Sequence, residues 1–344
     1  MSATGQYNLD KAAAEVVAYL SQGPPLYELP LDDVRKAVDG AQAGDAVPMP
    51  DVEEAWITVP ADVGAVRVSI IRPRDAEAQL PVVLYMHGGG WILGSIFSHG
   101  RLARELAVAA DAAVAFIDYT LAPEARYPVQ IEQCYAVARW VTERGESHGL
   151  DSSRIAVAGD SAGGNMATVL CMMAKQRGDV NFVQQSTYYP MTDALTYEDS
   201  ESYRLFKDGP YGDAKTMEWF WSTYLPEQDI RVDSTVSPLR ATRDELSGMP
   251  PALVIRRRER HPPRPRRGVR SQATRRRCAN GLRPFQRHDA RLHDAERLAG
   301  HRNGARSDEP GRFDVPSRVR YGSSVVLRRE EVAHRQAPIR APTI

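Results

Sequence analysis

Apolar residues recur along the first 255 positions in two alternating patterns. Six short β-branched stretches bounded by Gly, Pro or Asp are typical of strands; they cover residues 66–73, 82–87, 113–119, 154–159, 182–190 and 251–255. Between them, residues 101–110 and 129–145 repeat apolar positions at helical spacing. Because strands separated by helices favour parallel pairing, we predict an α/β fold with a mostly parallel sheet flanked by helices.

The two ends of the chain differ from this alternating region. The residues before the first strand favour helix, so we predict an N-terminal helical cap over residues 1–48 and a core over residues 49–255. Residues 256–344 contain 24 Arg, no Lys and 9 acidic residues, whereas the first 255 residues carry a net negative charge. With scattered prolines and few large apolar residues, this Arg-rich tail is predicted to be irregular, without a packed core of its own.

The composition bears on compartment and cofactors. None of the apolar runs among the 344 residues is long enough to span a bilayer, and the N-terminus lacks the basic and apolar segments of a secretory signal. The three cysteines, Cys134, Cys171 and Cys278, lie far apart and fit a reducing cytoplasm better than a disulfide framework. No metal-ligand spacing is present, so the sequence predicts a cytoplasmic protein without a metal site.

A Gly-x-Ser-x-Gly motif, residues 159–163, comes at the end of the predicted strand 154–159 and leads directly into a helix-like run. In this strand–turn–helix context the serine lies at a sharp turn, where its hydroxyl faces away from the sheet. Gly159 and Gly163 leave room for the strand and the helix to cross closely, and the helix start directs N–H groups at a reacting carbonyl. We therefore predict that Ser161 is a catalytic nucleophile.

The stretch "HGGGW", residues 87–91, lies where another predicted strand ends. Acyl transfer converts a carbonyl oxygen into an oxyanion, and backbone N–H groups stabilise it best where no side chain blocks their approach. We predict that three N–H groups form this oxyanion hole: those of Gly88, Gly89 and Ala162. Gly90 is predicted to let the chain turn away, and His87 to brace the glycine run rather than act as a base. A phosphate loop would require a Lys or a longer glycine spacing, which this stretch lacks.

The order of "HGGGW" and then "GDSAGGN" resembles the hormone-sensitive-lipase-like branch of the α/β-hydrolase fold. The segment "DYTLAPEARYP", residues 118–128, is similar to the family's segment between the two motifs, and the resemblance covers residues 1–255. It implies an enzyme that hydrolyses esters with short-to-medium acyl chains, needs no cofactor and carries an N-terminal helical cap. It also implies that Asp160 helps to hold the turn at Ser161 and that Asp118 is structural.

The family's remaining catalytic groups, an acid and then a histidine, are expected after the strand at residues 251–255. This sequence continues instead with "RRRERHPPRPRRGVR", in which prolines break the expected helix. Three interpretations stay open: a basic interaction tail, a disordered tail, and a reading frame that changes near residue 256. Codons permitted for residues 257–264, read one nucleotide forward, allow "AESDILR", and those around residues 284–294 allow "FNGTMHDFM". Both resemble the missing motifs, so we favour the changed reading frame.

The tail as written still contains titratable residues, but no pattern places any of them beside Ser161, so none is assigned a catalytic role. They include His261, His288, His293, His301, His334, Asp289 and Asp294.

Two function classes follow from the sequence. The first is a serine carboxylic-ester hydrolase of a small-molecule ester, impaired in this chain if the family's acid and base are absent. The second is a non-catalytic hydrolase-like protein with a basic tail. Arg without Lys and with few aromatics argues against a nucleic-acid partner; whether the chain forms a homo-oligomer stays open.

Overall fold

The computed structural model describes residues 11–41, 48–76, 78–195, 199–200, 203–204, 207–209, 212–225 and 227–256. Apart from Arg256, the Arg-rich tail lies outside the described residues. The predictions that it is irregular, that its titratable residues have no catalytic role and that its reading frame is changed all concern residues outside the described ranges. The boundaries proposed for the cap, the core and the tail stay predictions. In the described part of the chain, no helix is both long and apolar enough to cross a membrane.

The described strands form one seven-stranded sheet in the order β1-β2-β4-β3-β5-β6-β7. Their bounds are β1 Val52–Val59, β2 Val66–Pro73, β3 Leu80–Met86, β4 Ala113–Asp118, β5 Leu150–Asp160, β6 Gln184–Tyr188 and β7 Ala252–Ile255. β2 pairs antiparallel with β1 and with β4, and every other pair is parallel. The predicted fold class and the six predicted strands are confirmed, with small shifts at their ends.

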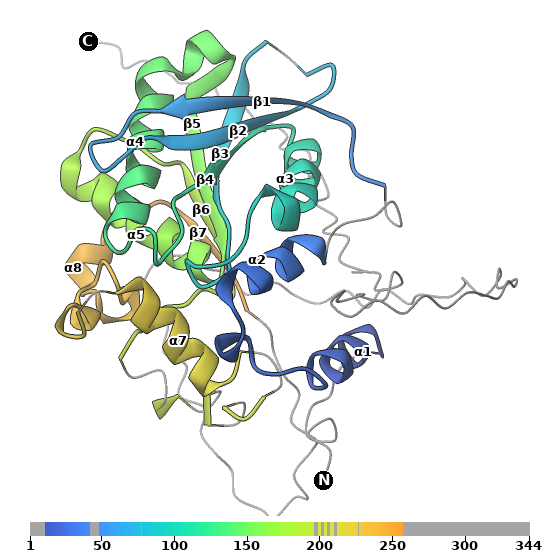
Figure 1. Ribbon diagram of the computed structural model, residues 1–344. Coiled ribbons are helices and arrows are strands. Elements are labelled where there is room, and N and C mark those ends of the chain that lie inside the picture. The colour runs from blue at the N-terminus through green and yellow to red at the C-terminus, as the bar shows by residue number, and fades with distance from the viewer. Residues whose placement is uncertain are drawn as a thin grey trace, which may run out of the picture. The chain divides into compact units, whose positions relative to one another are not determined.

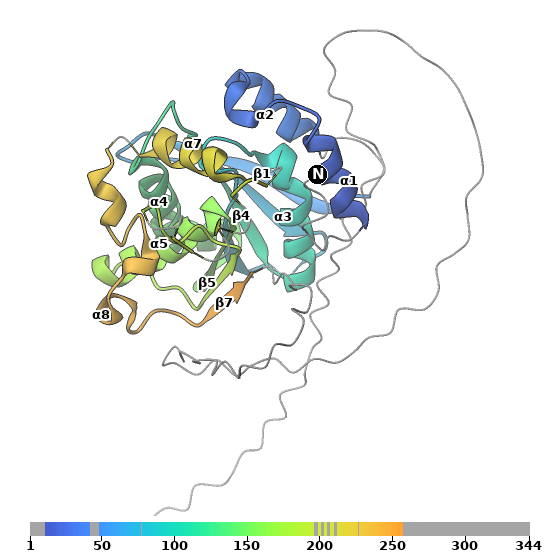
Figure 2. The ribbon, with the colours of Figure 1, turned by 90° about the horizontal axis from the view of Figure 1, so that it is seen from below.

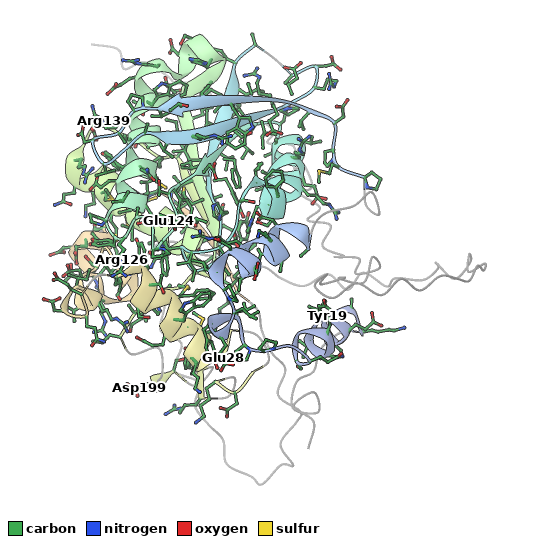
Figure 3. All side chains as sticks on the ribbon, in the orientation of Figure 1. Tyr19, Glu28, Glu124, Arg126, Arg139 and Asp199 are labelled. Carbon is green, nitrogen blue, oxygen red and sulfur yellow. The ribbon has the colours of Figure 1, made fainter. Side chains whose placement is uncertain are left out.

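Helices cover both faces of this sheet (Figures 1 and 2). The described α-helices are α1 Lys11–Leu20, α2 Leu31–Gly40, α3 Ile96–Ala110, α4 Val129–Arg144, α5 Ala162–Arg177, α7 Ala214–Tyr224 and α8 Arg243–Leu246. Short 3₁₀ turns are η2 Leu26–Glu28, η3 Gly145–His148, η5 Asp229–Val232 and η6 Pro238–Arg240. Side chains on α1, η2 and α4, among them Tyr19, Glu28 and Arg139, are labelled in Figure 3.

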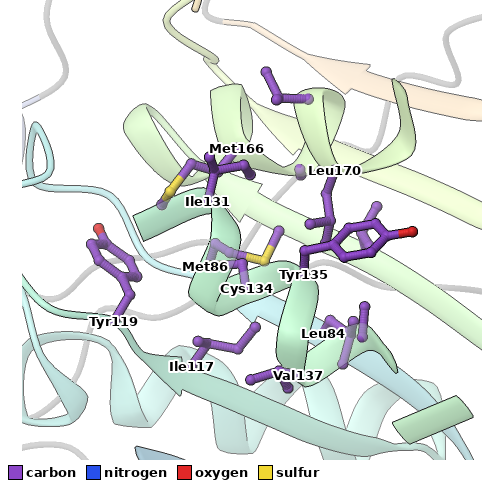
Figure 4. Close-up of a cluster of buried hydrophobic side chains, with 14 of the residues drawn as sticks. Leu84, Met86, Ile117, Tyr119, Ile131, Cys134, Tyr135, Val137, Met166 and Leu170 are labelled. Carbon is purple, nitrogen blue, oxygen red and sulfur yellow. The ribbon is translucent and has the colours of Figure 1, made fainter. Parts of the chain in front are cut away.

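The core consists of one apolar layer on each face of the sheet, because successive side chains of a strand point to opposite faces. On one face, small residues of α3, Ala103 and Ala107, pack with Tyr85 and Phe116. The next residue of β3, Met86, belongs to the other layer, which α4 and α5 cover (Figure 4). Members of that second layer include Leu84, Ile117, Ile131, Cys134, Val137, Met166 and Leu170.

Capping residues decide where the two predicted helices begin and end. α4 starts directly after Pro128 and ends at Gly145, in agreement with the prediction. α3 starts five residues earlier than its apolar period indicated, because the Ser95 hydroxyl accepts the N–H of Phe97 and completes a capping box with Ser98. Apolar spacing alone therefore predicts a helix shorter than α3.

The two edges of the sheet differ from the predicted pattern. β1 was not predicted, because its glutamates interrupt the apolar alternation; Glu54 accepts hydrogen bonds from Ser69 and Arg104. At the other edge, β7 pairs with β6, and no described strand pairs with its outer side. Its side chains are exposed on both faces, with Leu253 45% and Val254 57% exposed.

Candidate active site

The Gly-x-Ser-x-Gly motif forms a sharp turn between β5 and α5. Ser161 lies between the last residue of β5 and the first residue of α5, with φ 52° and ψ −114°. A positive φ strains any residue that has a Cβ, so surrounding contacts must hold it. The N–H of Ser161 donates to the carbonyl of Tyr188 at 2.8 Å, and its own carbonyl accepts the N–H groups of Asn165 and Met191 at 3.1 Å.

Two glycines allow β5 and α5 to approach closely enough to form this turn. A Cβ at Gly159 would overlap the carbonyl of Gly163 and lie 2.6 Å from the carbonyl oxygen of Met86. A Cβ at Gly163 would overlap the Met86 carbonyl as well, and would lie 2.8 Å from the carbonyl oxygen of His87. Since all of these neighbours are backbone atoms, a side chain at either glycine would push the helix away from the strand.

The turn leaves Ser161 partly exposed at the start of α5. Within the described ranges, no side chain or backbone group hydrogen-bonds its hydroxyl. The N–H of Ala162, the first residue of α5, likewise has no acceptor among the described residues. The strand–turn–helix context predicted from the sequence is therefore present, and it places a free hydroxyl beside a free N–H group at a helix N-terminus.

The glycine loop, residues 87–95, connects β3 to α3 through a tight turn. Gly89, Gly90 and Trp91 all have positive φ, at 110°, 62° and 64°. The carbonyl of Gly89 accepts the N–H groups of Ile92 and Leu93. The N–H groups of Gly89 and Gly90 have no acceptor in the part of the chain that the structure describes, so two neighbouring donors stay free on this loop.

The structure requires a correction for Gly88, whose N–H was predicted to stabilise an oxyanion. That N–H already donates to Oδ1 of Asp160 at 2.9 Å, in a buried hydrogen bond. A donor committed to a carboxylate is not free for a substrate oxygen. Gly88 instead requires its lack of a side chain, because a Cβ there would overlap the Asp160 carboxylate.

Asp160 is the point at which the glycine loop is attached to the serine turn. Asp160 is 6% exposed, and its carboxylate also accepts the Tyr85 hydroxyl at 2.7 Å. Its Oδ2 lies 3.6 Å from Nε2 of His99. Burial raises the pKa of Asp160, but His99, the Tyr85 hydroxyl and the Gly88 N–H together outweigh burial, so the pKa lies below its usual value.

His87 is fully buried, and one of its ring nitrogens contacts the glycine loop. Nδ1 lies 2.8 Å from the carbonyl of Gly88; since a carbonyl only accepts, Nδ1 carries the hydrogen. Nε2 has no partner among the described residues. Burial, and secondarily the nearby His99, lowers the pKa of His87 to about 3. His87 is therefore a neutral donor to the Gly88 carbonyl, and its role in bracing the loop stays a prediction.

No described histidine hydrogen-bonds the hydroxyl of Ser161. His87 is bound to Gly88, His99 faces Asp160, and the ring of His148 lies against Trp140 at 4.8 Å. The five other histidines lie in the tail, outside the described ranges. Among the described residues, no group of three or more His, Cys, Asp or Glu side chains is arranged to hold a metal ion.

Comparisons with known proteins show the family to which this chain belongs. A profile described as the alpha/beta hydrolase fold matches residues 83–262. R526 of Acanthamoeba polyphaga mimivirus, whose name assigns it to the alpha/beta hydrolases, is 34% identical over 72% of this chain and 70% of its own. An ethyl acetate hydrolase of Pseudomonas putida is 32% identical over 67% of this chain and 73% of its own.

The similarity extends to solved structures. A thermostable esterase from Pseudomonas putida ECU1011 matches with a TM-score of 0.68 and 38% identity, over 72% of this chain and 77% of that chain. The chain therefore belongs to the α/β-hydrolase family, as the two motifs predicted. For the first curated relatives, the matched share of the relative's own length is 58–70%.

Proposed function

We propose that this chain is a serine carboxylic-ester hydrolase whose nucleophile is Ser161. The observation that carries the proposal is the free hydroxyl of Ser161, held at positive φ beside free backbone N–H groups. Turns of this kind expose a nucleophile at the carboxyl edge of a sheet and place it at a helix N-terminus. Esterase relatives and the family membership support the same reaction class.

The oxyanion hole of the proposed enzyme uses the N–H groups of Gly89, Gly90 and Ala162. Gly89 and Ala162 keep the roles that the sequence predicted, and Gly90 replaces Gly88, whose N–H is held by Asp160. Neighbouring glycine donors on one loop and a helix N-terminus on the other side are suited to a developing alkoxide. His87, Asp160 and the glycines Gly159 and Gly163 support this arrangement without touching the substrate.

In the proposed reaction, the Ser161 oxygen attacks the ester carbonyl carbon, while a general base accepts the hydroxyl proton. The carbonyl oxygen becomes the oxyanion of a tetrahedral intermediate. This intermediate then collapses to an acyl-enzyme as the alcohol leaves with that proton. Water then attacks the acyl-enzyme in the same way, and the carboxylic acid is released. We assign the base and its orienting acid to neither a described residue nor a tail residue, because no described histidine hydrogen-bonds the Ser161 hydroxyl.

The proposed substrates are uncharged small esters with short-to-medium acyl chains. The relative named an ethyl acetate hydrolase supports the short end of this range. The ring of Phe220 packs directly against Gly90, since a Cβ at Gly90 would overlap it. A bulky aromatic wall beside a proposed oxyanion donor favours small acyl groups.

A fluorophosphonate probe tests the nucleophile in the full chain. We expect the probe to label Ser161 slowly, because no described base activates its hydroxyl, and the Ser161→Ala variant to lose that labelling, while the residual hydrolysis of p-nitrophenyl acetate falls to the background rate. Ser153→Ala is the matched control, because Ser153 is an exposed serine with its hydroxyl on Asp151. Labelling elsewhere in the chain, or full turnover by Ser161→Ala, would overturn the assignment.

The second candidate is a non-catalytic protein with a hydrolase-like core. It is favoured by one observation: within the described residues, no histidine reaches the Ser161 hydroxyl. A chain of this kind would show neither probe labelling nor ester turnover, although it would fold. The probe experiment therefore separates the two candidates.

A further inference from the structure

Arg35, on α2, contacts two other segments that are remote in the sequence. Its Nε donates to the carbonyl of Ile92 in the glycine loop at 2.9 Å. Its Nη2 donates to the carbonyl of Ala122 at 2.9 Å, and both Nη atoms bind the Glu124 carboxylate at 2.6 and 2.8 Å. One side chain thus joins the N-terminal helix, the glycine loop and the segment that follows β4.

Hydrogen bonds join the glycine loop, the segment after β4 and Arg35 in a closed ring. The carbonyl of Trp91 accepts the N–H of Ala122 at 2.9 Å, while the carbonyl of Ala122 accepts Arg35. Trp91 is fully buried, has positive φ, and stacks on Tyr224 with ring centroids 4.1 Å apart. The carbonyls of both Trp91 and Ile92 are therefore fixed by hydrogen bonds from outside the loop.

The apolar contacts of α2 reinforce the same attachment. Val34 is 1% exposed and packs in a small core with Ile92, Leu93 and Phe220. A second polar contact joins the Asp39 carboxylate of α2 to the Ser95 hydroxyl at the end of the loop, at 2.6 Å. α2 therefore contacts the loop at several points along its second half, directly after the glycines whose N–H groups are free.

We propose that Arg35 is a positioning residue: it fixes the Ile92 carbonyl and thereby holds the glycine loop with its free N–H groups presented for acyl transfer. This proposal rests on the proposed function of that loop. The peptide planes of residues 89–92 are linked by the turn that Ile92 and Leu93 close on Gly89. Fixing the carbonyl end of that turn limits rotation of its N–H end, which is the preorganisation that an oxyanion hole requires.

The guanidinium group is required for this geometry. Its planar fork supplies separate donors to two carbonyls and two carboxylate oxygens at once, whereas an ammonium group is a point charge with three donors. Arg35→Lys therefore keeps the charge and most of the stem but loses the simultaneous contacts. Glu124→Gln is the converse change, because it weakens the ion pair and leaves the bonds to both carbonyls in place.

Hydrogen exchange of the full chain, followed by peptide mass spectrometry, tests the proposal independently of enzyme activity. In Arg35→Lys we expect exchange of the peptide covering residues 88–95 to accelerate about 10- to 100-fold, the effect of losing a hydrogen bond to a charged group. Peptides from β3 and β5 should keep their rates. Glu124→Gln should change the loop less than about threefold.

Arg139→Lys is the matched distant control. Arg139 is an ion-paired arginine of α4, bound to Glu143 at 3.1 Å, and it does not contact the glycine loop. Its substitution should leave exchange of residues 88–95 unchanged. If Arg35→Lys fails to fold, Arg35→Gln, which removes the charge and keeps an N–H₂ group, is measured in its place with the same expectation.

A second readout links the loop to chemistry. The maximal rate of fluorophosphonate labelling at Ser161 should fall about tenfold in Arg35→Lys with little change in probe affinity, because the defect lies in transition-state stabilisation. Unchanged loop exchange, equal acceleration in Glu124→Gln, or acceleration throughout the sheet would each overturn the positioning role. Absence of labelling in the unsubstituted chain would instead overturn the proposed function, and the exchange result would still decide the role of Arg35.

Discussion

Acid should destabilise the folded chain through one buried histidine, His87. The pKa of His87 is lowered from 6.5 to about 3 by burial and by the nearby His99. Below pH 6.5 the unfolded chain therefore binds a proton at this position that the folded chain rejects until about pH 3. Stability is present above pH 6.5 and is lost as the pH falls through that window.

The size of the effect follows from the shift. At 1.36 kcal/mol per pKa unit, lowering the pKa from 6.5 to about 3 amounts to about 4–5 kcal/mol, lost at about 1.4 kcal/mol per pH unit. Since domains are typically stable by only about 5–15 kcal/mol, this single group can remove a large share of the total.

The matched variant is His87→Asn. An Asn amide keeps a neutral N–H donor near the position of Nδ1, which lies 2.8 Å from the Gly88 carbonyl, but it cannot titrate. The free energy of unfolding is measured by guanidinium denaturation, followed by tryptophan fluorescence, at intervals between pH 7 and 4.5. His87→Asn should be less stable at pH 7, because the ring no longer stacks on Tyr119, but its loss per pH unit should be about 1.4 kcal/mol smaller. Parallel pH profiles for the two chains would refute the reasoning, since all carboxylates are common to both.

Three further outcomes are expected. Gly163→Ala should lower the denaturation midpoint strongly or abolish soluble protein, because the added Cβ would overlap the Met86 carbonyl; an unchanged midpoint would mean that α5 can shift. Moving the reading frame by one nucleotide after codon 255 should raise p-nitrophenyl ester hydrolysis by several orders of magnitude, since loss of a complete triad costs about 10⁶-fold in kcat in a well-studied serine protease; high activity in the unshifted chain would contradict this. In the shifted chain, Gly89→Val should lower kcat about 10²–10³-fold by displacing a proposed oxyanion donor, and a folded variant with unchanged kcat would show that Gly89 only shapes the turn.

The strands of the parallel region and the turn at Ser161 could be predicted because their signals are local. A run of β-branched residues that ends in Gly-x-Ser-x-Gly gives both the direction of β5 and the start of α5. The partner of each loop N–H could not be predicted in the same way. Gly88 and Asp160 are 72 residues apart, and only the paired strands β3 and β5 bring the Gly88 N–H to that carboxylate.

The missed features share this dependence on distant partners. The glutamates of β1 argue against a strand in the sequence. In the structure, Glu54 is accommodated because it accepts hydrogen bonds from Ser69 and Arg104. Arg35 carries no local signal, because its partners lie 57 to 89 residues away. A charged residue on a polar helix face has the same sequence appearance whether it faces solvent or binds a loop carbonyl, so a single sequence does not separate the two.

The exposed β7 edge has a consequence for how the protein behaves at different concentrations. An edge strand whose outer side pairs with no described strand, and which exposes apolar residues on both faces, such as Leu253 and Val254, can pair with the same strand of another molecule. Self-association of this kind increases with concentration and competes with refolding after dilution from denaturant. Sedimentation and refolding yield should therefore depend on protein concentration, and a charge placed at Val254 should reduce that dependence while leaving Ser161 and the glycine loop in place.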